Sequence, residues 1–215
     1  MISLWQEKLQ SRDEDVLIVL MQNNPGILNE KDTSGASYFS MLGYYRLSKA
    51  LDAATYLKHD FDLYEAILTG QKELVKAILK KDETLLNSYS PDGFTPVALA
   101  AYFGKSEIAG ILLEMGADPG IPASNPSKVN ALHAAVAQND LDLAKKILEK
   151  GIDVNSTQMQ GVTALHSAAH RGSKEMVELL LEFGADKRQT TENGESAADF
   201  ARKDSHENIL PLLEQ

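Results

Sequence analysis

Apolar residues recur at helical spacing in short segments along almost the whole chain, with polar turns between them. Ile108, Ile111 and Leu112 stand at positions i, i+3 and i+4, the pattern of a helix with one buried face. The same spacing returns in three further segments, at 74–79, 141–148 and 176–181. No segment keeps the alternation of apolar and polar residues that a half-buried strand requires. The pattern predicts an all-α protein made of short helices.

A nine-residue motif divides these helices into units of nearly constant length. GFTPVALAA at 93–101 returns as GVTALHSAA at 161–169, and worn copies stand at 128–135 (KVNALHAA) and 194–201 (GESAADFA). The copies begin at 93, 128, 161 and 194, so they are 35, 33 and 33 residues apart. A period of about 33 residues with this motif indicates an array of helical repeats, in which each unit buries its apolar face by stacking on its neighbours.

Each full unit contains the start and stop signals of two helices. In the unit that begins near residue 90, Thr95 is placed to cap a first helix, and Pro96 occupies its first position, where the missing N–H has no cost. Gly104 ends this helix and Gly116 ends the second, because glycine most readily adopts the left-handed conformation of a helix end. The sequence therefore predicts helix–turn–helix units joined by short turns.

The first third of the chain keeps the spacing but has lost most of the motif. Residues 3–12 align on 61–70, and residues 15–45 align on 73–103 without a gap, an offset of 58 residues. That offset equals two units of which one is about ten residues short. The shortening falls near Tyr56 to Phe61, where we expect that a hairpin finger is missing and that the curvature of the stack changes.

The pattern predicts about seven units in a single domain. An N-terminal capping helix pair is expected at 1–30 and a C-terminal capping repeat at 190–215. The repeats between them are expected at 31–57, 58–89, 90–123, 124–156 and 157–189. The terminal units need a polar outer face because no neighbour covers it, and charged residues within 7–15 and 202–214 suit that role.

These motifs resemble the ankyrin repeat family. Gly-x-Thr-Pro/Ala-Leu-His, the glycine between the two helices and the Gly-Ala-Asp after the second helix occur within 90–189, and part of this pattern extends through 190–215. In 1–89 only the spacing and the apolar positions persist. The resemblance implies a solenoid of helix pairs with short hairpin fingers. It also implies binding of other proteins through the finger tips and the concave face of the first helices, and no shared catalytic activity.

The composition of the chain limits the kinds of partner and the cellular compartment that we expect. The chain has 215 residues, 43% of them hydrophobic, and a formal net charge of −10. This acidic balance argues against nucleic acid and against an anionic membrane as partners, whereas it suits a basic protein surface. Cysteine is absent, which excludes disulfides and thiolate metal sites. Because neither a secretory signal pattern nor an apolar run of about 20 residues is visible, a cytoplasmic protein is expected.

Aromatic residues are the main candidates for a binding surface. Tyr44, Tyr45, Tyr102 and Phe103 occupy the two positions before the inter-helix turn, which the resemblance places in the concave groove, and His170 and Arg171 hold the same positions in a later unit. The finger positions add Tyr89, Phe94, Met159 and Val162. Large amphipathic side chains in such places either pack between neighbouring units or anchor a partner, and both interpretations stay open.

No residue pattern indicates catalysis, a cofactor or a metal. His133 and His166 occupy the Leu-His slot of the repeat, where the resemblance implies an imidazole that forms hydrogen bonds across the turn and orders it. The chain contains no H-E-x-x-H motif, no P-loop and no G-x-S-x-G motif. The histidines are therefore expected to be structural.

The function predicted from the sequence is non-enzymatic protein–protein recognition by a monomeric scaffold, adaptor or regulator. Two alternatives stay open. One is an acidic inhibitor or immunity protein for a basic enzyme, whose association rate would depend strongly on salt. The other is an enzyme of an unrecognised kind, which would need a deep pocket with converging ionisable groups.

Overall fold

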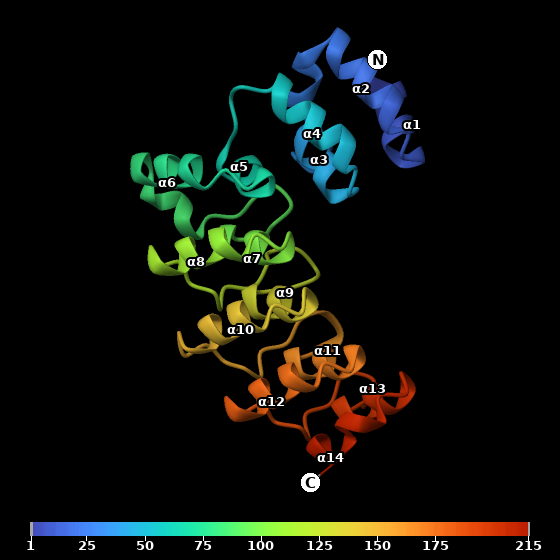
Figure 1. Ribbon diagram of the computed structural model, residues 1–215, viewed down its shortest axis with the longest axis vertical. Helices are drawn as coiled ribbons and strands as arrows, with labels where there is room; N and C mark the ends of the chain where they lie inside the picture. The colour runs from blue at the N-terminus through green and yellow to red at the C-terminus, as the bar shows by residue number, and fades with distance from the viewer. Residues whose placement is uncertain (1, 215) are drawn as a thin grey trace. The chain divides into compact units, whose positions relative to one another are not determined.

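The computed structural model describes residues 2–214, which form two compact units, residues 2–81 (unit 1) and 82–214 (unit 2). Both units consist of short helices arranged in pairs (Figure 1). Isolated bridges such as that between Thr157 and Thr163 close turns, and within the described residues they build no sheet. The all-α repeat architecture predicted from the sequence is confirmed.

Unit 1 packs its helix pairs around buried aromatic rings. Trp5 stacks on Tyr38 with ring centroids 5.6 Å apart, and Phe39 meets the edge of Phe61 at 5.4 Å. The outer helices also expose the apolar side chains of Ile2, Leu4 and Val19 beside their charged residues. The helices are α1 (Ile2–Ser11), α2 (Glu14–Asn23), η1 (Pro25–Asn29), α3 (Tyr38–Tyr44), α4 (Ser48–Leu57), α5 (Leu63–Thr69) and α6 (Lys72–Lys81).

Unit 2 is a stack in which the first helices of successive pairs, α7, α9, α11 and α13, pack on one another (Figure 1). Buried alanines such as Ala100, Ala135 and Ala168 allow these helices to approach closely. The helices are η2 (Glu83–Asn87), α7 (Pro96–Tyr102), α8 (Ser106–Glu114), α9 (Ala131–Ala137), α10 (Leu141–Leu148), η3 (Met159–Gly161), α11 (Ala164–Arg171), α12 (Lys174–Glu182), α13 (Ala197–Lys203), η4 (Glu207–Ile209) and α14 (Leu210–Leu213).

Two buried histidines tie the first helices α9 and α11 to the finger that follows each of them. His133 Nδ1 accepts a hydrogen bond from the Asn130 backbone N–H, and its Nε2 donates to the carbonyl of Ser156 at 3.1 Å. His166 repeats the arrangement with the Thr163 N–H and the Glu195 carbonyl, also at 3.1 Å. Burial lowers the pKa of both rings, for His133 to about 4. Both imidazoles are therefore neutral, and the structural role expected for them is confirmed.

The fingers of unit 2 are joined to one another by backbone hydrogen bonds at their tips. The Ser124 N–H donates to the Gly93 carbonyl at 2.8 Å, and the Met159 N–H donates to the Ser127 carbonyl at 2.9 Å. The Glu192 N–H continues the row to the carbonyl of Gln160 at 3.0 Å. A ladder between separate turns restrains each finger against its neighbour, so the finger row is a preformed surface.

Unit 1 contains the shortened joint. The helix α4 ends at Leu57 and α5 begins at Leu63, so residues 58–62 form a direct link without a finger. A buried ion pair lies there: Lys58 Nζ is 3.5 Å from Glu65 Oε2 and also contacts Asn29 Oδ1. Ser37 Oγ donates to Glu65 Oε1 at 2.7 Å. The missing finger is thus replaced by a polar cluster that the sequence pattern did not indicate.

The boundary between the two units follows Lys81. The short helix η2 packs against α7 and belongs with unit 2. The range 58–89, predicted from the sequence as one repeat, therefore contributes α5 and α6 to unit 1 and its last segment to unit 2.

Candidate protein-binding surface

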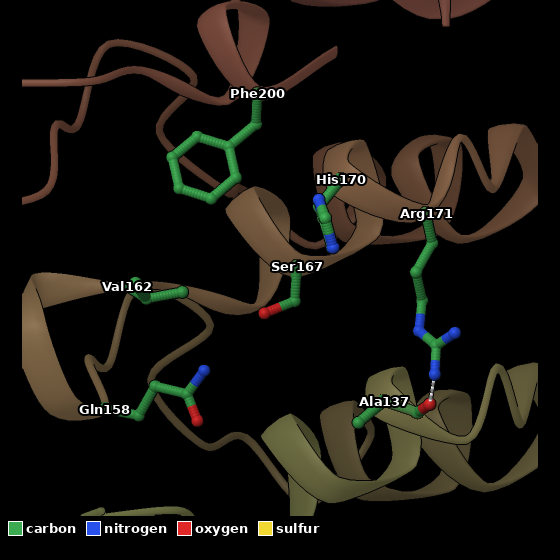
Figure 2. Close-up of a pocket in the computed structure, with 7 residues that line it drawn as sticks. All are labelled: Ala137, Gln158, Val162, Ser167, His170, Arg171 and Phe200. Carbon is green, nitrogen blue, oxygen red and sulfur yellow. Dashed lines mark hydrogen bonds between the residues drawn. The ribbon is translucent and has the colours of Figure 1, made fainter. Parts of the chain in front are cut away.

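A groove in unit 2 is the main candidate site. It has a volume of about 610 Å³ and is formed by the end of α9, the finger that follows α10, one face of α11 and the helix α13 (Figure 2). Ser167, His170 and Arg171 stand at i, i+3 and i+4 on α11, which places their side chains on one face. The lining residues are Ala137, Gln158, Val162, Ser167, His170, Arg171 and Phe200.

The groove combines apolar walls with polar groups that have no internal partner. Val162 and Phe200 provide the apolar walls. The side chains of Gln158 and Ser167 point toward the same space (Figure 2), and neither forms a side-chain hydrogen bond within residues 2–214. An amide and a hydroxyl can together donate to and accept from a ligand. The groove can therefore bind a group that has both apolar surface and hydrogen-bonding atoms.

Neighbouring repeats hold the side chains of Arg171 and His170. The Arg171 guanidinium donates to the Ala137 carbonyl at the end of α9. His170 Nδ1 lies 2.6 Å from Asp204 Oδ2, and the imidazole is 62% exposed. Helix ends leave carbonyl groups without an intrahelical partner, and here a side chain of the following repeat supplies the donor. Arg171 thus has a structural role, while the His170 imidazole remains largely exposed.

A hydrogen bond of the same kind joins the groove to an aromatic cluster. Gln138, next to the lining residue Ala137, donates its amide to the Tyr102 carbonyl. Tyr102 is 37% exposed, and its ring centroid lies 5.7 Å from that of Phe94 and 5.2 Å from that of Phe103. The three rings connect finger and helix end within one repeat, and Tyr102 leaves part of its ring in solvent.

The other residues predicted for the site are more scattered. Tyr89 is 47% exposed and donates its hydroxyl to the Pro122 carbonyl at 3.2 Å, and Met159 at a finger tip is 54% exposed. Tyr44 and Tyr45 are half-buried and belong to unit 1, where the Tyr45 carbonyl accepts from Arg12.

Of the ten residues predicted from the sequence, the groove therefore brings together Val162, His170 and Arg171. Sequence reasoning did not select Ala137, Gln158, Ser167 or Phe200. Ala137 stands at the same position of its unit as Tyr102 and His170, so its place in the repeat indicates it. Phe200, at the position of Ser167, reaches the groove through the packing of α13 on α11. Gln158 and Ser167 carried no signal, because a polar residue on a repeat surface is ordinary unless its neighbours are known.

The described residues contain no group of three or more His, Asp or Glu side chains that could hold a metal ion. No helix among them is long and apolar enough to cross a membrane.

Comparison with known proteins identifies the class. Residues 63–158 and 132–215 match the family model for ankyrin repeats (three copies). Because these segments cover more than half of the chain, the protein belongs to the ankyrin repeat family. Ankyrin repeats are protein–protein interaction modules, and proteins built from them are typically non-enzymatic.

Similar proteins share segments of the chain. The ankyrin repeat and SAM domain-containing protein 6 of Rattus norvegicus is 30% identical over 100 residues, which are 46% of this chain and 11% of that protein. The nuclear factor NF-kappa-B p105 subunit of Gallus gallus is 34% identical over 105 residues, again 46% and 11%. The DNA-binding protein RFXANK of Homo sapiens is 38% identical over 61 residues, 28% and 24%. The matched segments thus span less than a quarter of each relative.

Proposed function

We propose that this protein is a scaffold or regulator that binds another protein with the groove and the aromatic cluster of unit 2. The observation that carries the proposal is a preformed groove whose Gln158 amide and Ser167 hydroxyl have no hydrogen-bond partner in the described chain. A surface restrained by a hydrogen-bonded finger row loses little conformational entropy when it binds. Tyr102 and Met159 extend this surface with exposed side chains suited to anchor a partner.

The distribution of charge supports a basic partner for this unit. Residues 82–215 contain 20 Asp and Glu against 11 Lys and Arg, whereas residues 1–81 contain 11 against 10. The acidic character of the chain is therefore concentrated in the unit that carries the groove. A field of one sign attracts a partner of the opposite sign and raises the association rate. We further propose that the protein acts as a monomer, since a monomer leaves the groove open. The compartment that we propose is the cytoplasm.

The experiment is partner capture followed by a quantitative binding assay. The full chain retrieves partners from native lysate, mass spectrometry identifies them, and the affinity of the purified partner is measured for wild type and for Tyr102→Ala/Phe103→Ala. We expect the double variant to bind at least tenfold more weakly, about 1.4 kcal/mol. Gln158→Ala should weaken binding less, because it removes hydrogen bonds alone.

A matched control is Tyr56→Ala, which removes a tyrosine that is 85% exposed in unit 1. Wild-type affinity for this control, together with unchanged helical content for every variant, would assign the loss to the groove region. Equal affinity of wild type and the double variant would refute the assignment. An association rate that falls steeply with salt, with little effect of Tyr102→Ala/Phe103→Ala, would instead favour an acidic inhibitor of a basic enzyme.

A further inference from the structure

A glycine lies in the interior of α8 although the packing of the chain does not require it. Apart from its chain neighbours and the backbone of its own helix, a Cβ atom built on Gly110 meets no atom within 4 Å. The other glycine inside an α-helix of the described chain, Gly43 in α3, differs, because a Cβ there would lie 2.5 Å from Leu68 Cδ1. Glycine weakens a helix interior relative to alanine, since it loses more backbone entropy on folding. Contacts within the protein therefore do not explain why α8 has a destabilising glycine at position 110.

The other repeats provide an internal comparison. Gly110 is the fifth residue of α8, the second helix of its pair. The fifth residue of α6 is Lys76, that of α10 is Lys145 and that of α12 is Glu178. All three are long, charged and exposed. Three other second helices thus cover this position with a side chain, and α8 leaves it bare.

The bare position opens a depression between α8 and α10, away from the groove formed by α9, α11 and α13. It has a volume of about 340 Å³, and Gly110, Leu113 and Glu114 line it from α8. Its other wall consists of Lys146, Glu149 and Lys150, at and just beyond the end of α10. Leu113 is buried and forms an apolar floor beside Gly110, which is half-buried.

The charges around this depression are not paired with one another. Lys146, Lys150, Glu114 and Glu149 take part in no ion pair within the described chain, although Lys76 and Glu178 at the fifth position of other helices do. Two ammonium groups and two carboxylates leave the rim neutral overall. Any charged side chain that entered would approach like charges on part of the rim, and such contacts oppose binding.

We propose that this depression binds a tyrosine or tryptophan side chain of a partner protein. A flat ring fits against the uncovered backbone at Gly110 and over the apolar floor at Leu113. Lysine ammonium groups are attracted to the face of an aromatic ring, so Lys146 and Lys150 would hold the bound ring by this attraction. The carboxylates of Glu114 and Glu149 accept the phenol O–H or the indole N–H, so the amphipathic ring satisfies both parts of the rim.

The experiment selects peptides on this surface. A phage-displayed library of random dodecapeptides is selected on the immobilised full chain and counter-selected on Gly110→Gln, a neutral side chain long enough to cover the floor. The recovered peptides are expected to share a tyrosine or a tryptophan. Replacing that residue with alanine, or Gly110 with glutamine, should weaken binding at least tenfold. Glu178→Gln, at the same position of α12, should leave binding unchanged.

Recovery of peptides that depend on Gly110 but contain no aromatic residue would overturn the proposal, and so would recovery of no such peptide. A stability measurement tests the premise. Gly110→Ala should raise the thermal unfolding midpoint, because its methyl group meets open space. A lower midpoint would show that the fold itself requires this glycine. Since the two surfaces are separate, loss of binding in the groove variants leaves this result unaffected.

Discussion

The two units of this protein are built from the same helix pair but hold their repeats together differently. In unit 2, neutral buried histidines and finger-tip hydrogen bonds connect each repeat to the next. In unit 1, the link at 58–62 has no finger, and a buried Lys58–Glu65 ion pair takes its place. The connections in unit 2 recur along the chain and are visible as a sequence motif. The ion pair in unit 1 is a single local arrangement. The difference shows that one repeat fold tolerates two kinds of polar joint.

The largest effect should come from breaking the charged joint of unit 1. Glu65→Ala leaves the Lys58 ammonium buried with Asn29 and Asp60 as its remaining contacts, so the free energy of unfolding should fall by about 3–5 kcal/mol. Trp5 is the sole tryptophan and lies fully buried in unit 1, so urea unfolding followed by its fluorescence reports this unit. Lys58→Met/Glu65→Leu should recover most of the loss. A double variant no more stable than Glu65→Ala would contradict the pairing.

Acidification should affect the two units in opposite directions. The folded-state pKa of His133 is lowered to about 4 by burial, so its stabilising effect is complete above about pH 6.5 and is lost as the pH falls toward 4. At pH 5 this loss amounts to about 2 kcal/mol for unit 2. Burial raises the pKa of Glu65, although the hydrogen bond from Ser37 opposes this shift. Unit 1 therefore becomes more stable as the pH falls from the folded-state pKa of Glu65 toward the lower pKa that this carboxyl has in the unfolded chain.

The pH prediction is checked by comparing two probes at pH 7 and pH 5. Trp5 fluorescence follows unit 1, and NMR signals of the buried alanines in α9 and α11 follow unit 2. His133→Asn should unfold with a smaller change between the two pH values, because it removes the titrating group. Equal acid sensitivity of wild type and this variant would eliminate His133 as the cause.

The smallest effects should distinguish the helix caps of the two units. Thr95→Ala removes the cap of α7 and should cost about 1 kcal/mol. Ser37→Ala removes the cap of α3 and also the hydrogen bond to the buried Glu65, so it should cost about 2 kcal/mol. Chemical unfolding of both variants measures the difference. Equal losses would indicate that the Ser37–Glu65 contact adds nothing to the stability of unit 1.

Much of this fold could be predicted because it depends on local signals. Thr95 and Pro96 start α7, Gly104 ends it, and the structure keeps all three roles, since capping depends on residues close in the chain. The Leu-His slot likewise implied the bonds of His133 and His166, because the motif carries its own partners at fixed spacing. The absence of a finger at 58–62 followed from the length of the offset between aligned segments.

The candidate surfaces were less predictable. Val162, His170 and Arg171 were selected by position in the unit, but Ala137 and Phe200 join them only through the stacking of α9, α11 and α13. Tyr102 and Phe103 were selected without any indication that their rings contact each other. The depression at Gly110 required knowing what a methyl group at that position would meet.

By itself, the sequence determined the repeat architecture, the positions of the caps in unit 2 and the structural role of the histidines, because the same short-range signals recur every 33 residues or so. Only the tertiary structure decided that Lys58 meets Glu65 across the short joint, that the groove collects residues from three repeats, and that α8 leaves one position bare. Those features depend on contacts between residues of different helices. The spacing of these residues in the chain does not indicate such contacts.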